Sequence, residues 1–225
     1  MSLHKLSVKA VIFDMDGVIT NTMPDHYRAW VKILKKEGVA VTHHDIYSRE
    51  GQRGIHSVEE MFKKYKRSFT NEIAARILKD KEEYFKKIVK TRFVPGARKF
   101  LKNLYRRNFK LALVTGTSRH ELHQILPDSI YQLFSIVVTG NDVKDGKPHP
   151  EPYLKALKKL RIRAIEAVVI ENAPFGIQSA KHAGLRCLAL ETSLPKKYLK
   201  RADFIFPSIK NLNQNVRFVL KEDKR

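Results

Sequence analysis

The chain has very little cysteine, little tryptophan and no long apolar run. Its 225 residues include one cysteine, Cys187, which excludes an internal disulfide framework and a cysteine-based zinc cluster. The first apolar stretch, residues 8–13, is far shorter than the ~18 residues of a membrane-spanning helix. The first residues also lack the long apolar region and the small-residue cleavage site of a signal peptide. We therefore expect a cytoplasmic protein with no membrane partner.

Acidic residues are scarce relative to basic ones. Lys and Arg number 44 against 23 Asp and Glu, so the formal net charge at pH 7 is +21. This charge could mark a nucleic-acid surface, steer small anionic substrates into a cleft, or reflect solvated lysine-rich helix faces. The basic residues come in short pairs along the chain, such as Lys35-Lys36 and Lys158-Lys159, and form no long block. The third interpretation is favoured, and nucleic acid is not the expected partner.

The apolar residues are sufficient for a large core, at 43% of the chain. Short apolar runs alternate with longer helical patterns, which is typical of a parallel sheet with crossover helices. The predicted strands are 8–13, 110–114, 136–138, 167–170 and 186–190, and the predicted helices are 97–107, 119–126, 151–160 and 175–183. Continuous apolarity predicts strands that are buried on both faces. The expected fold class is α/β, with a doubly wound, Rossmann-like parallel sheet.

The alternation of strand and helix stops between residues 24 and 92. Periodicity there is helical throughout, as in the apolar face formed by Ala29, Trp30, Ile33 and Leu34. Residues 93–96 contain Pro and Gly, which often mark a chain crossing between two bodies. The sequence therefore predicts an all-helical cap domain, residues 23–92, inserted into a core made of residues 1–22 and 93–225.

The strongest local signal is the segment that follows the first predicted strand. Asp14 and Asp16, separated by one residue and followed by Gly17, lie where doubly wound sheets bind ligands. If the chain turns after Asp14, both carboxylates can converge on one point. Such a pair could bind a hard cation, supply a nucleophile and an acid/base group, or do both.

Two further segments supply groups suited to an anion. The segment Thr115-Gly116-Thr117 ends the second core strand with hydroxyls and a glycine before a predicted helix. Lys147 lies in a proline-stiffened loop just before another helix, where its ammonium would be a point charge for phosphate.

A fourth strand end adds oxygen donors. Glu171 and Asn172 follow the predicted strand 167–170, and both side chains are suitable ligands for Mg²⁺. Each of the four segments alone is ambiguous, but together they offer carboxylates, hydroxyls, a cation and metal ligands at neighbouring strand ends.

This ordered set resembles the haloacid dehalogenase-like hydrolases, in the subgroup with a helical cap after the first motif. The resemblance covers residues 8–209, and within the family it is strongest to beta-phosphoglucomutase and related sugar-phosphate phosphatases. It implies that Asp14 is the nucleophile and Asp16 the general acid/base. It also implies that Thr115, Lys147 and the loop amides hold the phosphoryl group.

The resemblance further implies a Mg²⁺ cofactor. Its ligands would be the Asp14 carboxylate, the backbone carbonyl of Asp16, and the fourth-motif pair Glu171 and Asn172. That motif usually ends in aspartate, so Asn172 removes one formal charge and we expect weaker metal affinity.

The resemblance places substrate recognition in the cap. Gly51 matches a glycine of the family's substrate loop, but Gly54 stands where an arginine is common, and Arg53 could substitute by a shift of one residue. His26, in the first cap helix, would hold or shuttle a proton near the hinge.

The implied function is hydrolysis of a small phosphomonoester, a sugar phosphate or phosphoglycolate-like acid, through an aspartyl-phosphate. An alternative is a beta-phosphoglucomutase-type reaction, in which a sugar hydroxyl intercepts the phospho-enzyme. A more remote alternative is a catalytically weakened nucleic-acid-binding or regulatory protein. We expect a monomer whose partner is a small phosphorylated metabolite.

Overall fold

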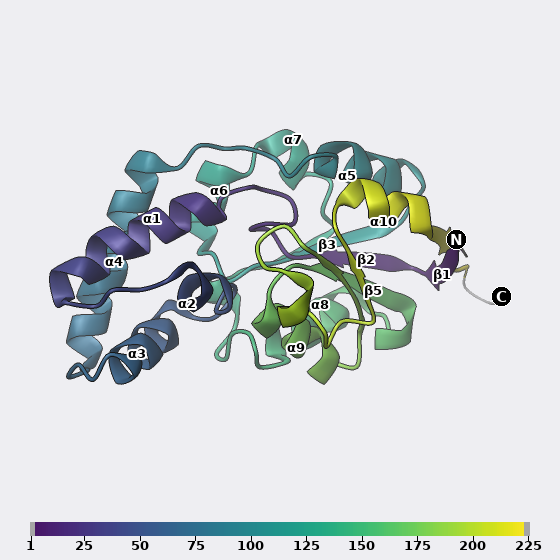
Figure 1. Cartoon of the computed structure of the whole chain (residues 1–225). Helices are drawn as coiled ribbons and strands as arrows, with labels where there is room; N and C mark the ends of the chain where they lie inside the picture. Colours follow the sequence, from purple (N-terminus) through teal and green to yellow (C-terminus); the bar gives the residue numbers. More distant parts are fainter. Residues whose placement is uncertain (1–2, 223–225) are drawn as a thin grey trace.

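The computed structural model describes residues 3–222 and is built around a parallel β-sheet with helices on both faces (Figure 1). Its six strands lie in the order β4-β3-β2-β5-β6-β7, and every neighbouring pair is parallel. Their bounds are β2 Ala10–Phe13, β3 Lys110–Val114, β4 Ile136–Val138, β5 Ala167–Glu171, β6 Arg186–Leu190 and β7 Phe204–Phe206. The predicted α/β class is confirmed.

Alternate residues of the central strands face opposite helical layers. On β2, Val11 and Phe13 belong to the core cluster under α5, α6 and α10, whereas Ala10 and Ile12 belong to the cluster under α8 and α9. The bounds are α5 Ala97–Arg106, α6 Arg119–Ile125, α7 Asp128–Tyr131, α8 Glu151–Leu160, α9 Pro174–His182 and α10 Ile209–Asn215. Short 3-10 turns occupy Lys35–Glu37, Gly140–Asp142, Ala164–Glu166 and Lys196–Tyr198. The sheet is therefore buried on both faces, as its continuous apolarity indicated.

The first predicted strand, 8–13, is wrong in one respect, because it is two strands that separate at Lys9. β1, His4–Val8, leaves the main sheet and pairs in parallel with β8, Val216–Leu220. Neither β7 nor β8 was predicted. β7 has only three residues, and β8 carries the exposed Arg217 within its apolar run, so neither gives a clear pattern.

Residues 23–88 form helices joined by short loops, with no β-strand among them, and we call them the helical insertion. The helices are α1 Met23–Leu34, α2 His43–Tyr47, α3 Gly54–Lys64 and α4 Asn71–Ile88. They share an apolar core of their own, which includes Trp30, Met61 and Ile77. Two chain crossings join them to the sheet, where Asn21 N donates to Arg92 O and Val94 N donates to Ile19 O.

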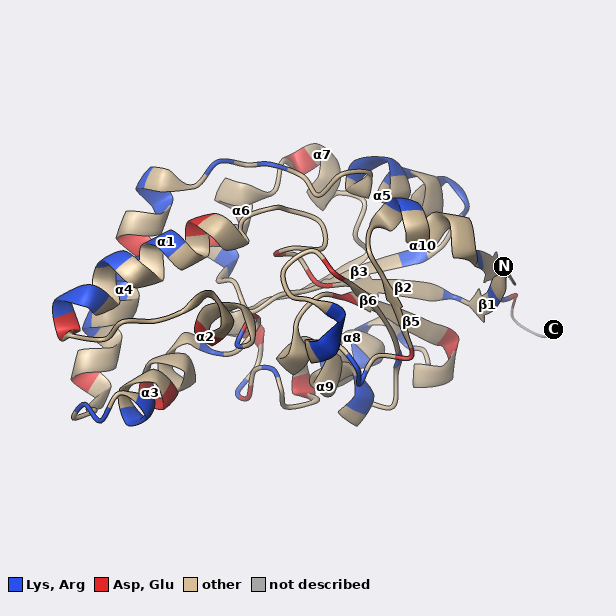
Figure 2. Ribbon diagram, viewed as in Figure 1, with Lys and Arg blue, Asp and Glu red and all other residues tan. Residues whose placement is uncertain are grey.

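Lys and Arg are distributed over helices of both the insertion and the sheet layers (Figure 2). Within residues 3–222, no helix combines the length and apolarity needed to cross a bilayer.

Candidate active site

The predicted site residues of the core come together at the carboxyl ends of three adjacent strands. Asp14 follows β2, Thr115 follows β3 and Glu171 ends β5, and these strands are neighbours in the sheet. The loop before α8 brings Lys147 to the same place. All four side chains are buried, so the sheet order and the loop before α8 together convert four distant motifs into one cluster.

Lys147 is the centre of this cluster. Its Nζ donates to Asp14 Oδ1 at 2.6 Å, to Glu171 Oε1 at 2.7 Å and to the Val114 carbonyl at 3.2 Å. Burial alone would lower the pKa of Lys147, but the carboxylates of Asp14 and Glu171 outweigh it and raise that pKa above its ordinary value. Lys147 is therefore a permanent cation, and its side chain is buried.

Asp14 is only partly compensated by this lysine. Its Oδ2 is buried and has no hydrogen-bond partner in the described part of the chain. Burial, reinforced by the negative charges of Glu171 and Asp16 and opposed by Lys147, raises the pKa of Asp14 to about 7. One oxygen is thus anchored, and the other is free to meet a cation or an electrophile.

The pKa of Asp16 is shifted in the opposite direction to that of Asp14. It accepts hydrogen bonds from the hydroxyls of Thr22 and Thr117, and His26 Nε2 lies 3.5 Å from its Oδ1. Burial raises its pKa, but the hydrogen bond and charge of His26 and the two hydroxyls prevail and lower it. Asp16 is held ionised beside Asp14, which suits a base.

The turn that brings the two aspartates together depends on Gly17. Its φ is +86°, and a Cβ there would lie 2.1 Å from Asn172 Nδ2. The turn closes through hydrogen bonds from the backbone N–H groups of Val18, Ile19 and Thr20 to the Met15 carbonyl. A side chain at position 17 would therefore displace the fourth motif as well as strain the backbone.

The segment after β3 is tied into the same network. Thr115 Oγ1 accepts a hydrogen bond from the backbone N–H of Thr117, whose own hydroxyl donates to Asp16 Oδ2 at 3.0 Å. A Cβ on Gly116 would lie 2.8 Å from the backbone of Gly51. The glycine allows the helical insertion to rest directly on this loop.

Glu171 and Asn172 differ in what they offer a metal ion. Both oxygens of Glu171 are engaged, Oε1 by Lys147 and the Tyr153 hydroxyl and Oε2 by the backbone N–H groups of Asn172 and Ala173. Asn172 Oδ1 is buried and has no partner in the described residues. The geometry favours Asn172 as a ligand and Glu171 as the group that positions Lys147.

Two sequence-predicted residues of the substrate loop lie against the core. Gly51 has φ +77°, and a Cβ there would lie 2.4 Å from Lys147 Cδ. Arg53 donates to the Lys144 carbonyl, so its guanidinium is anchored on the loop that carries Lys147. The ring of His26 stacks on Phe85 with centroids 4.0 Å apart.

Sequence reasoning missed several residues of the site. Glu50 is the most important: it is buried, and Asn172 Nδ2 donates to its Oε2 at 3.0 Å. Burial, with the charges of Asp14, Asp16 and Glu171, raises its pKa well above the ordinary value, although Lys147 opposes this. Its position next to Gly51 was the available signal. Thr22, Tyr153 and Ser193 gave no motif by which they could be found.

A cavity of about 330 Å³ opens over Asp14 and Asp16. The core side includes the segment 115–118, and the insertion side includes Trp30, Arg49 and Lys81. Its size and mixed lining suit a small polar molecule.

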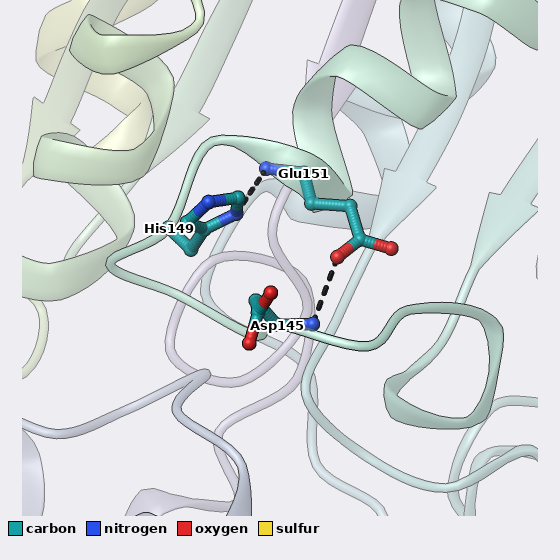
Figure 3. A group of neighbouring side chains, drawn as sticks. All are labelled: Asp145, His149 and Glu151. Atoms are coloured by element: carbon teal, nitrogen blue, oxygen red, sulfur yellow. Dashed lines mark hydrogen bonds between the residues drawn. The ribbon is translucent and has the colours of Figure 1, made fainter.

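A second group of metal-binding residue types lies outside this cavity. Ligand atoms of Asp145, His149 and Glu151 lie within 4.8 Å of one another (Figure 3). Glu151 accepts hydrogen bonds from the backbone N–H groups of Lys144 and Asp145, and its own N–H donates to His149 Nδ1. These bonds explain the group as the start of α8, and no ion is needed to account for it.

Comparison with known proteins gives consistent matches. Residues 11–190 match the family model described as haloacid dehalogenase-like hydrolase. The phosphorylated carbohydrates phosphatase of Thermotoga maritima is 32% identical over 182 residues, which cover 79% of this chain and 82% of that protein. The beta-phosphoglucomutase of Bacillus subtilis is 28% identical over 197 residues, covering 84% and 85% respectively. A solved structure of a candidate beta-phosphoglucomutase from Bacteroides vulgatus superposes with a TM-score of 0.84 at 35% identity, covering 94% of this chain and 88% of the other.

Proposed function

Because the chain belongs to the haloacid dehalogenase-like hydrolases, we propose that it is a Mg²⁺-dependent phosphatase acting on a small phosphomonoester. The substrate class is a sugar phosphate or a phosphoglycolate-like acid. The observation that carries the proposal is the buried Asp14, with one oxygen fixed by Lys147 and the other without a hydrogen-bond partner among residues 3–222.

Asp14 is the nucleophile in this proposal. One of its carboxylate oxygens forms a bond to phosphorus while the ester P–O bond breaks, giving an aspartyl-phosphate and an alcohol. Lys147 offsets the negative charge of the phosphoryl oxygens, and the Thr115 hydroxyl with the amides of Gly116 and Thr117 orients them.

Asp16 moves the proton in both halves of the reaction. It protonates the departing alkoxide, and it then takes a proton from the water that attacks phosphorus and releases Asp14. Its hydrogen bonds hold it in the ionised form that the second half requires. The negative charge of a bound phosphoryl group opposes ionisation and favours the protonated form that the first half requires.

The donor set fits a hard divalent cation. Asp14 Oδ2 and Asn172 Oδ1 are buried oxygens without partners in the described residues, and together with the Asp16 backbone carbonyl they would hold Mg²⁺. The cation would supply positive charge that offsets the repulsion between the carboxylate and the phosphoryl group.

We assign residues 23–92 as the cap and residues 1–22 and 93–225 as the catalytic core. The cap would exclude water, and Gly51, Arg53 and His26 would select the leaving group. Cavity-lining residues from both parts support this division.

The test is phosphate release from a panel of sugar phosphates and phosphoglycolate-like acids, with Mg²⁺ or with EDTA, beside an Asp14→Asn control. Release that requires both the cation and Asp14 is the expected result. Release that survives Asp14→Asn would overturn the assignment of the nucleophile.

A phosphoglucomutase is the second candidate, favoured by similarity to the Bacillus subtilis and Bacteroides vulgatus proteins. It predicts that beta-glucose 1-phosphate yields glucose 6-phosphate without free phosphate. Absence of both reactions would instead favour a non-enzymatic role.

A further inference from the structure

Asn172 and Glu50 form a pair across the boundary between the core and the helical insertion. Asn172 Nδ2 donates to Glu50 Oε2 at 3.0 Å and to Ser193 Oγ at 2.7 Å. Asn172 is fully buried, and Glu50 is 9% exposed. The carboxylate of Glu50 therefore lies in the site itself and is not a solvated group at its rim.

Most of the buried side-chain oxygens that lack a hydrogen-bond partner in the described residues belong to this pair or to Asp14. Among residues 3–222, four buried side-chain oxygens have no hydrogen-bond partner: Asp14 Oδ2, Asn172 Oδ1, Glu50 Oε1 and Glu121 Oε1. The first three belong to the proposed active site. A buried oxygen without a partner is costly, and one divalent cation bound by these three would remove that cost.

The balance of buried charge also favours a cation. The carboxylates of Asp14, Asp16, Glu171 and Glu50 are buried. The buried ammonium of Lys147 pairs with Asp14 and Glu171, and His26 Nε2 lies 3.5 Å from Asp16 Oδ1. Buried charge without compensation is strongly unfavourable. Lys147 is already committed to Asp14 and Glu171, so Glu50 is the carboxylate with the least compensation.

Close backbone packing fixes Glu50 in this position. Its neighbour Gly51 lies very close to Gly116 and Lys147. A Cβ added to Gly116 would lie 2.8 Å from the Gly51 backbone, and a Cβ added to Gly51 would lie 2.4 Å from Lys147 Cδ. The Arg53 guanidinium donates to the Lys144 carbonyl on the same loop. The segment 50–53 is thereby held on the core at both ends.

We propose that Glu50 is a ligand from the helical insertion to the divalent cation, and that it supplies the negative charge that Asn172 lacks. This rests on the proposed metal-dependent function. The hydrogen-bonded pair Asn172 and Glu50 carries one negative charge, as a single aspartate at position 172 would. The cation would then join the insertion to the core, so binding of the cation and closure of the cavity would be one event.

The first experiment measures Mn²⁺ affinity by electron paramagnetic resonance for the full chain and for Glu50→Gln. We expect the dissociation constant to rise at least tenfold. Glu59→Gln is the matched control, because it makes the same substitution at a side chain on α3 that is more than half exposed. The Mn²⁺ dissociation constant of this variant should stay within twofold of wild type. A change of less than twofold in Glu50→Gln would overturn the proposal.

Thermal unfolding in EDTA separates a ligand from a structural residue. Glu50→Gln should unfold at the wild-type temperature or above, because it removes a poorly compensated buried charge. Addition of Mn²⁺ should then raise its midpoint less than it raises that of the wild type. A midpoint in EDTA several degrees below wild type would show that Glu50 is structural and would overturn the proposal.

A relocated charge gives the sharpest test. In the double variant Glu50→Gln, Asn172→Asp, the hydrogen bond is reversed and the carboxylate moves to the core. Mn²⁺ affinity should return to within threefold of wild type. However, Mn²⁺ should slow tryptic cleavage at the exposed segment 90–92 in the wild type and not in the double variant. Equal protection in both would refute a ligand that spans the boundary.

The two proposals fail in different ways. A wild-type chain that neither binds Mn²⁺ nor releases phosphate would refute the metal-dependent function, and the role of Glu50 with it. Binding and Asp14-dependent release that are unchanged in Glu50→Gln would refute only the role of Glu50.

Discussion

Asp14 in the core and Asp45 in the helical insertion are equally buried, each 2% exposed, yet their ionisation is opposite. Burial raises the pKa of Asp14 to about 7. Burial acts on Asp45 too, but hydrogen bonds from Lys64 and from the backbone and hydroxyl of Thr42 hold its pKa well below the ordinary range. Tyr65 donates to the same carboxylate at 3.2 Å.

The difference shows that a low exposed fraction does not by itself decide the role of a carboxylate. Asp45 lies less deep in the protein than Asp14, and it accepts hydrogen bonds from Lys64 and Thr42. Asp45 is saturated, and its bonds with Thr42 form the capping box that starts α2; the turn that carries Glu50 follows this helix. Asp14 keeps one oxygen that has no hydrogen-bond partner in the part of the chain that the structure describes. One aspartate stabilises the surface that closes the site, and the other keeps its second oxygen free for chemistry.

The largest expected effect that separates the two residues is on activity. Asp14→Asn should lower phosphate release at least about 10³-fold, because an amide cannot attack phosphorus effectively. Asp45→Asn should change the rate constant by less than about tenfold. Asp45 lines the cavity, but its carboxylate bonds within the described residues are to Thr42, Lys64 and Tyr65 of the insertion. Steady-state phosphate release from the best substrate checks both, and comparable losses in the two variants would break the comparison.

Asp14→Asn should stabilise the protein although it lowers the activity. In EDTA at pH 7, Asp14→Asn should increase the free energy of unfolding by about 2–4 kcal/mol, because each unit of raised pKa corresponds to about 1.4 kcal/mol of unfavourable ionisation. Lys147 keeps Glu171 and the Val114 carbonyl as partners. Urea unfolding measures the difference, and a destabilised variant would contradict the assignment of Asp14 as undercompensated.

Asp45→Asn should destabilise the protein by about 1–2 kcal/mol. It removes the carboxylate of a capping box and the ion pair with Lys64, which is half-exposed and adds little. Asp128→Asn, at the exposed start of α7, is the control and should stay within about 0.5 kcal/mol. If the two variants unfold alike in urea, the bonds around Asp45 contribute nothing.

The smallest expected effect is a difference in the pH range over which Asp14 and Asp45 affect the free energy of unfolding. The folded-state pKa of Asp14, about 7, lies above its unfolded value of 3.8. Between these values the folded state binds more protons, so the unfavourable contribution of Asp14 is complete above pH 7 and fades as the pH falls toward 4. The stability gap between Asp14→Asn and wild type should close over this range.

The contribution of Asp45 has the reverse sign. Its folded-state pKa is lower than its unfolded value of 3.8, so its stabilisation is complete above that value and is lost as the pH falls below it. The gap between Asp45→Asn and wild type should persist from pH 7 to pH 5. Urea unfolding at intervals of one pH unit measures the stability difference between each variant and wild type. If both differences disappear over the same pH range, the proposed contrast between Asp14 and Asp45 is contradicted.

The sequence predicted the parts of the molecule that depend on local pattern. The strands 110–114, 136–138, 167–170 and 186–190 and the helices 97–107, 119–126, 151–160 and 175–183 agree with the structure within one residue, because buried strands and amphipathic helices have strong periodicity. The grouping of Asp14, Thr115 and Glu171 followed from strand order, since parallel strands end at one edge.

The sequence could not give what depends on contact between distant segments. Glu50 has no motif of its own, and its role arises only because Gly51 and Gly116 let two loops touch. The full engagement of Glu171 likewise depends on Tyr153 and on backbone amides of the following turn. The pairing of β1 with β8 joins segments about two hundred residues apart, so no local pattern encodes it.

That pairing determines how the protein would carry mechanical load. β1 and β8 are parallel, with five residue pairs in register from His4 with Val216 to Val8 with Leu220, and they lie far from the helical insertion (Figure 1). Tension applied at the start of β1 and the end of β8 would shear the whole ladder at once and would not peel it pair by pair. The two strands would thus resist separation as one unit, at the end of the molecule opposite the helical insertion.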